Sequence, residues 1–231
     1  MKIQLFITIG TIALIGAACS PQGKQPQDKV SSEAVVREQA VAEPETTAPD
    51  FSPEQSGTST RNRELAADHE RFVAPISLSR ERITKKPFGI RVTPETSPLE
   101  PERFSGYHTG VDYETFEDEQ NTDVPIYAIC GGELLQKHTA SGYGGVLVQA
   151  CKRNGEDIRV IYGHIALGSV AHTIRDFIAA GEQIGLLGEA GQDTDEERKH
   201  LHLGVHGGTR VDFAGYVAKE EKLSAWMDLG L

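Results

Sequence analysis

The 231-residue sequence is short of basic residues, and no part of it gathers them into a cluster. It has 23 Lys and Arg against 34 Asp and Glu, a formal net charge of −11. Domains that bind nucleic acids contact phosphates with a basic patch or stripe. The composition therefore argues against a nucleic-acid partner. Part of the acidity is local, between Glu114 and Asp123, and we interpret that stretch as a solvated loop.

Residues 20–60 contain almost no large apolar residues. This segment has five prolines, one aromatic residue (Phe51) and no Leu, Ile, Met, Trp or Tyr. Such a segment cannot bury enough apolar surface to offset the entropy of ordering it. We therefore predict a disordered N-terminal tether over residues 20–60. Residues 61–85 are predicted to be a helical lead-in, because apolar residues from Arg63 to Val73 recur at helical spacing.

The sequence also lacks a transmembrane segment at its start. The uncharged apolar run from Leu5 to Ala18 is shorter than the about 20 residues that span a bilayer as a helix. A positively charged start and small residues at its end are typical of a signal peptide, here residues 1–19. Cys19 resembles a lipoprotein processing site. This predicts export to the cell envelope or periplasm and a lipid anchor on Cys19. Ordinary signal cleavage nearby is the alternative.

Cysteine is sparse, and apart from Cys19 only Cys130 and Cys151 occur. Each lies in or beside an apolar run, and a strong turn signal at residues 141–145 separates them. A hairpin closing near Ala140 would place residues 130 and 151 opposite each other. We therefore predict a cross-strand disulfide, which an oxidising compartment permits. Two buried thiols are the alternative, because antiparallel neighbours meet disulfide geometry only in some registers.

From Ile90 onward the sequence is typical of antiparallel strands joined by tight turns. Short runs rich in Val, Ile, Leu and Tyr alternate with clusters of Gly, Pro, Asn and Asp. Examples of such runs are residues 125–129, 145–149, 159–162 and 202–205. We predict a mainly β domain over residues 86–215 with few short helices. A C-terminal helix is predicted over residues 216–231, with Trp226 and Met227 packing back on the domain.

Three polar clusters follow one another along this region. They are His108-Thr109-Gly110-Val111-Asp112, Tyr162-Gly163-His164 and His200-Leu201-His202. His200 and His202 are two apart in a predicted strand, so both side chains project from the same face. His108 and Asp112 can be brought to one point if Gly110 permits a bend between them.

This combination of residue types suits a hydrolytic metal site. Two histidines and one carboxylate are three ligands, and they leave the fourth tetrahedral position of zinc open to water. Zinc would lower the pKa of that water and polarise a scissile carbonyl. The two remaining imidazoles can move a proton or stabilise an oxyanion. Each cluster alone is a weak signal, and the specificity comes from their combination in order.

At these residues the sequence resembles the lysostaphin-type, LytM-like zinc endopeptidases, which cut peptidoglycan peptides. The resemblance runs from about Lys86 to His206. Besides the three clusters it includes Pro87-Phe88-Gly89-Ile90-Arg91, Val124-Pro125-Ile126-Tyr127-Ala128, Gly142-Tyr143-Gly144 and Gly181-Glu182-Gln183-Ile184-Gly185. It implies an antiparallel β-sheet core with an active-site groove walled by loops.

The resemblance also implies a role for each polar side chain. It makes His108, Asp112 and His202 the ligands of one zinc ion. It makes His164 and His200 the catalytic pair that handles the proton and the tetrahedral intermediate.

The sequence thus predicts an exported zinc metalloendopeptidase with a zinc-activated water as nucleophile. The expected substrates are amide bonds in peptidoglycan stem peptides or cross-bridges, and the expected partners are peptidoglycan and a membrane. The alternative is a non-catalytic wall-binding or activating module for another cell-wall hydrolase. Relatives of that kind have lost ligands, whereas this chain keeps all three ligands and both catalytic histidines.

Overall fold

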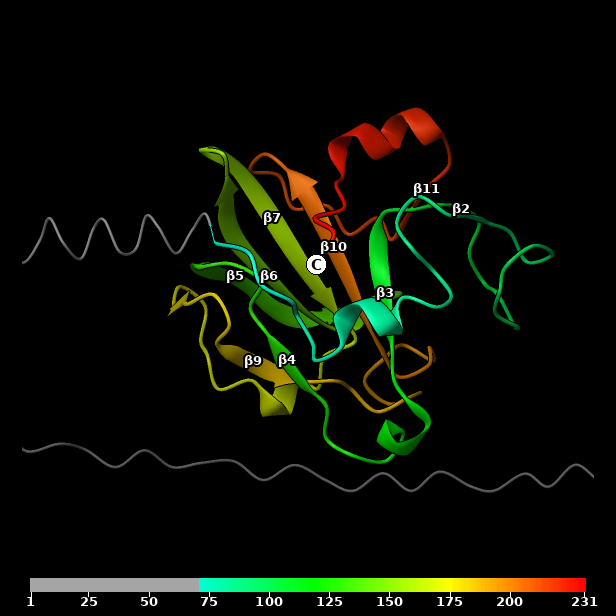
Figure 1. Cartoon of the computed structure of the whole chain (residues 1–231), viewed down its shortest axis with the longest axis horizontal. Helices are drawn as coiled ribbons and strands as arrows, with labels where there is room; N and C mark the ends of the chain where they lie inside the picture. Colours follow the sequence, from blue (N-terminus) through cyan, green and yellow to red (C-terminus); the bar gives the residue numbers. More distant parts are fainter. Residues whose placement is uncertain (1–70) are drawn as a thin grey trace, which may run out of the picture. The chain divides into compact units, whose positions relative to one another are not determined.

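Antiparallel β-sheet forms the centre of the domain (Figure 1). The computed structural model describes residues 71–231. The predicted signal peptide, Cys19 and the predicted tether lie outside the described residues. In chain order the strands are β1 (Arg91–Val92), β2 (Gly106–His108), β3 (Gly110–Glu114), β4 (Pro125–Tyr127), β5 (Gly132–Ala140), β6 (Gly144–Arg153), β7 (Glu156–Gly163), β8 (Phe177–Ile178), β9 (Gln183–Leu186), β10 (His200–Gly207) and β11 (Tyr216–Val217).

These strands form three sheets. The largest has six strands in the order β3-β10-β7-β6-β5-β8, a second joins β1, β2 and β11, and β4 pairs with β9. Every pairing between these strands is antiparallel. The predicted mainly β fold with an antiparallel core is confirmed.

Helical structure within residues 71–231 consists of four short 3-10 segments. They are η1 (Ser79–Arg82), η2 (Glu117–Glu119), η3 (Leu167–Ser169) and η4 (Glu220–Ala225). None of the helices in this described part is long and apolar enough to cross a membrane. Of the predicted helical lead-in over residues 61–85, the described portion contains η1, and the remainder lies outside the described residues.

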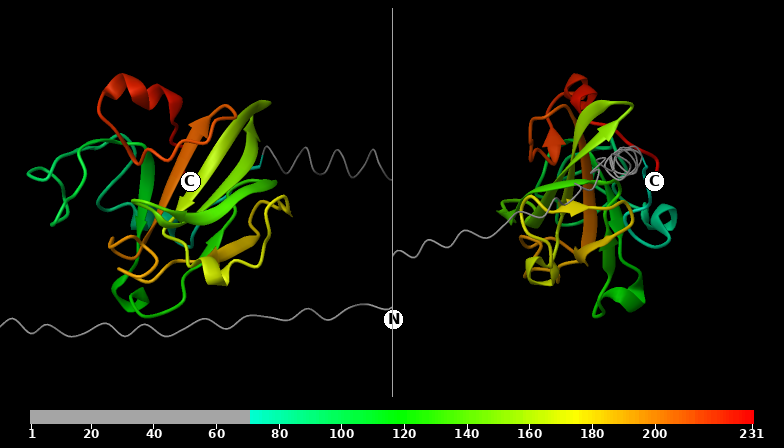
Figure 2. Two further views of the ribbon diagram at one scale, coloured as in Figure 1. Left: turned by 180° about the vertical axis from the view of Figure 1, so that it is seen from behind. Right: turned by 90° about the vertical axis from the view of Figure 1, so that its left-hand side faces the viewer.

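The C-terminal segment differs from the predicted helix over residues 216–231. Residues 216–217 form β11, and η4 spans only 6 residues. The helix ends because the backbone N–H of Met227 donates to the carbonyl of Val205, 3.0 Å away, and Trp226 is extended and bridges to His206 of β10. The C-terminal segment, coloured red, thus returns to the orange strand β10 after η4 (Figure 2). The predicted packing of Trp226 back on the domain is present, since its side chain is buried.

Alternation along β10 separates two faces of the large sheet. Leu201, Leu203 and Val205 belong to the main hydrophobic core. His200 and His202 alternate with these residues along the strand and therefore project from the opposite face. Burying each of these apolar side chains contributes on the order of 2 kcal/mol.

The neighbouring strand β3 shows the same alternation. Val111 and Tyr113 join the main core, so Asp112 and Glu114 project from the face that carries the histidines of β10. The strands pair with His202 opposite Asp112. A polar site is thereby built on one face of a sheet whose other face is the core.

The chain passes from the small sheet to the large one at Thr109. β2 ends at His108 and β3 begins at Gly110. The Thr109 N–H donates to the carbonyl of Gly215 at 3.0 Å, and its hydroxyl donates to the carbonyl of Ala214 at 2.5 Å. Thr109 is fully buried. These two bonds hold the crossing in place, so that residues on either side of it reach one point from two sheets.

Cys130 and Cys151 form the predicted disulfide. The hairpin around it differs in detail from the predicted one. β5 and β6 meet with Ala140 opposite Gly144, and the register shifts between Leu134 and Gln136. Cys130 therefore lies just before β5 rather than directly across a regular ladder from Cys151.

We expect removal of this disulfide to destabilise the domain. The two cysteines are 21 residues apart. Closing a loop of this size lowers the entropy of the unfolded chain and stabilises the folded domain by about 3 kcal/mol. The double variant Cys130→Ala/Cys151→Ala should lower the free energy of unfolding in urea by about that amount. Reduction of the unaltered protein is the control and should give a similar loss. An unchanged urea midpoint in both would contradict this contribution.

Candidate functional site

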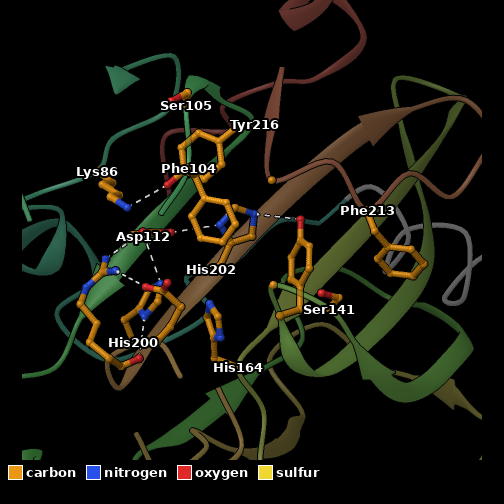
Figure 3. A pocket seen from close by; sticks show the side chains of 15 residues that line it. Lys86, Phe104, Ser105, Asp112, Ser141, His164, His200, His202, Phe213 and Tyr216 are labelled. Atoms are coloured by element: carbon orange, nitrogen blue, oxygen red, sulfur yellow. Dashed lines mark hydrogen bonds and ion pairs between the residues drawn. The ribbon is translucent and has the colours of Figure 1, made fainter. Parts of the chain in front are cut away.

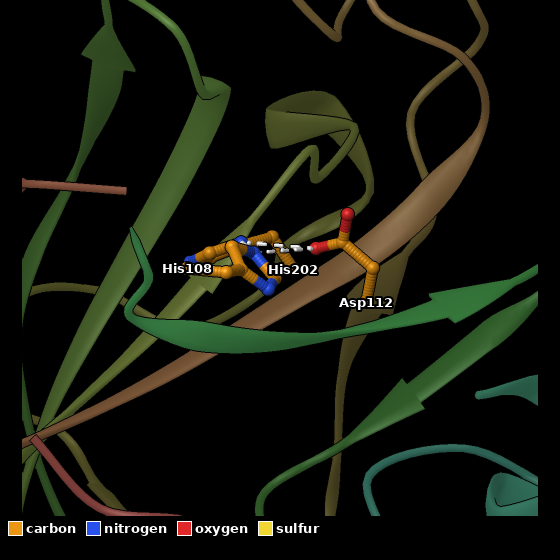
Figure 4. A group of neighbouring side chains, drawn as sticks. All are labelled: His108, Asp112 and His202. Atoms are coloured by element: carbon orange, nitrogen blue, oxygen red, sulfur yellow. Dashed lines mark hydrogen bonds and ion pairs between the residues drawn. The ribbon is translucent and has the colours of Figure 1, made fainter. Parts of the chain in front are cut away.

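Three side chains from two sheets converge on one point (Figure 4). His108 comes from β2, Asp112 from β3 and His202 from β10. His108 Nε2 lies 3.1 Å from His202 Nδ1. Asp112 Oδ1 lies 3.0 Å from His202 Nδ1 and 3.3 Å from His108 Nε2. All three residues are buried. The structure thus brings together the three residues that the sequence resemblance named as ligands.

The three donor atoms form a triangle that fits a single metal ion. Ligand atoms around a tetrahedral zinc with bonds of about 2.0–2.1 Å are separated by about 3.3 Å. The sides of the triangle, 3.0 to 3.3 Å, are close to that separation. Two imidazole nitrogens and one carboxylate oxygen also match the donor types of an open zinc site with three protein ligands.

The outer nitrogen of each histidine in the triangle has a partner that orients the ring. His108 Nδ1 lies 3.2 Å from the carbonyl of Pro87, to which it donates, and this leaves Nε2 free to bind a metal. His202 Nε2 lies 3.4 Å from the hydroxyl of Tyr143. Burial lowers the pKa of His202 to about 4, which outweighs the opposing effect of Asp112. Its imidazole is therefore neutral near pH 7, the form that binds metals.

Asp112 is an ionised carboxylate despite its burial. Burial works against ionisation, but the charges of His200 and His108 and their hydrogen bonds hold the pKa of the Asp112 carboxyl well below its usual value. Its second oxygen, Oδ2, lies 2.8 Å from Arg198 Nη2 and 3.3 Å from His200 Nε2. Oδ2 of Asp112 is thus ion-paired with Arg198 and faces His200.

Gly110 allows a close approach between β3 and β10, in addition to the bend that the sequence analysis assigned to it. A Cβ at this position would lie 2.7 Å from His202 Nε2 and 2.7 Å from the carbonyl oxygen of Leu203. Distances below 3.0 Å are too short for a Cβ contact. The bare backbone of Gly110 therefore leaves the space that the His202 ring occupies.

His164 and His200 lie beside the triangle with ring centroids 4.2 Å apart. His200 Nδ1 donates to the carbonyl of Arg198 at 2.9 Å, so its Nε2 faces Asp112 and the pocket. His164 Nδ1 is buried without a hydrogen-bond partner. Burial lowers the pKa of His164 well below its usual value, and protonation of the neighbouring His200 or His202 would lower it further. A neutral imidazole with a free nitrogen can accept a proton.

His164 reaches the site through an unusual backbone conformation. It follows the last residue of β7 and has a φ of 63°. The left-handed region costs a residue with a side chain about 1–2 kcal/mol. The backbone N–H of His164 donates to the carbonyl of Tyr143 at 2.9 Å, and its carbonyl accepts the N–H of Gly188 at 2.7 Å. These bonds hold the strained turn that directs the ring toward His200.

Four of the five polar side chains, Asp112, His164, His200 and His202, line an open pocket of about 290 Å³ (Figure 3). Aromatic side chains form two of its walls. Phe104 stacks on Tyr216 with centroids 5.3 Å apart, and Tyr143 meets Phe213 edge to face at 6.1 Å. The pocket is lined by Lys86, Phe104, Ser105, Asp112, Ser141, Gly142, Tyr143, His164, Glu197, Arg198, His200, His202, Phe213, Gly215 and Tyr216. The predicted groove walled by loops thus has a counterpart in the structure.

Several pocket residues were not identified from the sequence. Lys86 is buried, forms an ion pair with Glu102 at 2.6 Å and donates to the Tyr216 hydroxyl at 2.9 Å. Lys86 and Tyr216 come from distant parts of the chain, and no spacing rule connects them. The sequence does contain a signal for Arg198. It lies two residues before His200, and residues two apart in an extended chain project to the same side.

The site region matches a known family. Residues 106–213 match the model of Peptidase family M23. Endolysin 2638A of Staphylococcus phage 2638A is 28% identical over 134 residues, which make up 52% of this chain and 26% of the endolysin. The match therefore covers far less than two thirds of that relative.

Similar solved structures include LytU, with a TM-score of 0.43 at 23% identity, covering 69% of this chain and 85% of that one. They also include the catalytic domain of the antimicrobial peptidase lysostaphin from Staphylococcus simulans. Its TM-score is 0.38 at 20% identity, covering 62% of this chain and 84% of that one.

We expect His202→Ala and Asp112→Ala each to abolish metal binding, because the triangle has no spare donor. After dialysis, the zinc content per chain measured by elemental mass spectrometry should fall from one ion to almost none. His172→Ala is the matched control, since His172 faces Glu182 and does not line the pocket. If either triangle variant stayed fully metallated, the donor set would be wrong.

Proposed function

We propose that this chain, whose residues 106–213 match the model of Peptidase family M23, is an exported zinc metalloendopeptidase that hydrolyses peptidoglycan. Its substrates are amide bonds in stem peptides or cross-bridges. The observation that carries this proposal is the complete polar set at the pocket: a buried triangle of donors with two further histidines beside it. A binding module would have no need of that set.

His108, Asp112 and His202 would hold one zinc ion. When bound, zinc supplies Lewis-acid activation of water and of the scissile carbonyl. The buried surroundings favour this chemistry, because charges and dipoles act more strongly where water is excluded. The open side of the site faces the pocket, so a peptide can approach the metal position.

His164 and His200 would move the proton that hydrolysis requires. The water that attacks the carbonyl carbon must lose a proton, and the departing amine nitrogen must gain one when the C–N bond breaks. His164 is neutral and its Nδ1 has no partner, so this nitrogen can receive a proton. His200 donates from Nδ1 to the Arg198 carbonyl, which leaves its Nε2 to hydrogen-bond the reacting groups.

The disulfide supports export, because disulfides persist in oxidising compartments. We propose that residues 1–19 are the export signal and that Cys19 carries a lipid that anchors the chain to a membrane of the cell envelope. Residues 20–60 would then be the tether between anchor and enzyme.

We expect His164→Ala and His200→Ala each to lower kcat by about 100- to 10,000-fold, the usual contribution of a positioned acid or base. Zinc content should remain that of the unaltered chain, because neither residue belongs to the triangle. Activity and zinc content should be measured on the same samples. If both variants retained full turnover, neither His164 nor His200 would take part in the catalytic step.

The function itself is tested by incubating the full chain, loaded with zinc, with isolated peptidoglycan. We expect newly released amine ends and cleaved peptides, which chromatography and mass spectrometry would resolve and which would identify the bond. His200→Ala should release at least about 100-fold less in the same time, and His172→Ala should match the unaltered chain. Binding to peptidoglycan without any cleavage, with zinc present, would favour a non-catalytic wall-binding or activating module.

A further inference from the structure

The two oxygens of Asp112 face different partners. Oδ1 faces the nitrogens of His108 and His202 at 3.3 and 3.0 Å. Oδ2 faces Arg198 Nη2 at 2.8 Å and His200 Nε2 at 3.3 Å. The carboxylate therefore has one oxygen in the donor triangle and the other engaged outside it (Figure 3).

Arg198 is itself held rigidly. Its Nε lies 3.0 and 2.9 Å from the two carboxylate oxygens of Glu114, and its Nη2 also bonds Glu114 Oε1. Only 20% of its side chain is exposed. Glu114 is opposite His200 in the ladder and two residues after Asp112, so it projects from the same face. A fork-shaped guanidinium between two carboxylates has a fixed direction, which a lysine would not provide.

We propose that Arg198 is a positioning residue that occupies Asp112 Oδ2 and so restricts Asp112 to one-oxygen ligation of the metal. The proposal rests on the proposed function, because it requires that the triangle bind zinc. Glu114 fixes the guanidinium in place. It also balances the charge of Arg198, so that Asp112 keeps a full negative charge for the metal.

The backbone of Arg198 extends this role to the proton-transfer side. Its carbonyl accepts the Nδ1–H of His200 at 2.9 Å. One residue therefore orients a metal ligand through its side chain and a catalytic histidine through its main chain. Side-chain replacement should disturb the first function and leave the second in place.

Loss of the guanidinium has a specific chemical consequence. With Oδ2 free, Asp112 can rotate or bind through both oxygens, which changes the number of atoms around the metal. Groups that orient metal ligands from outside typically change metal affinity by about 10- to 100-fold when removed. A residue that only stabilised the fold would lower the melting temperature without changing the coordination of the metal.

The test compares three variants of the full chain. Arg198→Met alone would leave the carboxylates of Asp112 and Glu114 without the guanidinium that lies between them. The main variant is therefore Arg198→Met/Glu114→Gln, which replaces this ion pair with two neutral side chains. Arg198→Lys keeps the charge without the fork. Arg103→Met is the matched control, because Arg103 pairs with Glu197 and touches none of the triangle residues.

Zinc affinity is measured by competition with a chromophoric chelator, and folding by thermal unfolding of the metal-free chain. We expect the dissociation constant to rise about 10- to 100-fold in the double variant and less in Arg198→Lys. Arg103→Met should stay within about threefold of the unaltered chain, since it leaves ligand orientation intact. In the cobalt-substituted chain, the double variant should show weaker visible absorption, the sign of a higher coordination number.

An unchanged zinc dissociation constant or an unchanged cobalt spectrum in the folded double variant would overturn the proposal while leaving the proposed function standing. Failure of the unaltered chain to bind zinc would overturn both. Neither measurement depends on cleavage of peptidoglycan, so the two hypotheses are tested separately.

Discussion

The pairing of β3 with β10 is the constraint on which the site depends. Antiparallel pairing puts His202 opposite Asp112 and His200 opposite Glu114. Side chains opposite each other have Cβ atoms about 4.5–5.5 Å apart, so one ladder places two acids within reach of two histidines. The remaining groups arrive from the ends of strands: His108 at the end of β2 and His164 just after β7.

A buried cluster of charged and polar side chains carries an energetic cost that the rest of the domain must offset. Desolvating an ion is expensive unless it is paired and hydrogen-bonded. Asp112 meets that condition through Arg198 and three histidines, and Arg198 in turn meets it through Glu114. Stabilisation comes from the other face of the same strands, where the alternating apolar residues form the main core. Apolar burial on one face of these strands therefore offsets the cost of burying polar groups on the other face.

Much of this arrangement could be predicted from the sequence, because it depends on local periodicity. The shared face of His200 and His202 follows from their spacing in a strand. The turn signal at residues 141–145 predicted the hairpin and, with it, the disulfide between Cys130 and Cys151. Interactions between distant segments could not be predicted in that way. The bond between Lys86 and Tyr216 and the stacking of Phe104 on Tyr216 join residues far apart in the chain.

One prediction differed from the structure because a tertiary contact overrode local preference, and one residue has a role that local reasoning did not assign to it. The C-terminal segment has helical spacing, but the bond from Met227 to Val205 draws it out of the helix after η4. Gly110 was interpreted as permitting a bend between His108 and Asp112, and the structure adds that its missing side chain leaves room for the His202 ring. In both cases the contact is made by a residue of β10, either Val205 or His202. These residues are distant in sequence from the segments that they contact, so local periodicity cannot reveal them.

The alternation along β10 also determines which kinds of sequence change this strand tolerates. A substitution affects one face only, so a leucine may be exchanged for another apolar residue without altering the histidines between. Insertion or deletion of a single residue is different, because it shifts the register and moves every following side chain to the opposite face. Imidazoles would then enter the core while leucines faced the pocket. Over the course of divergence, β10 can vary in composition but has to keep its length.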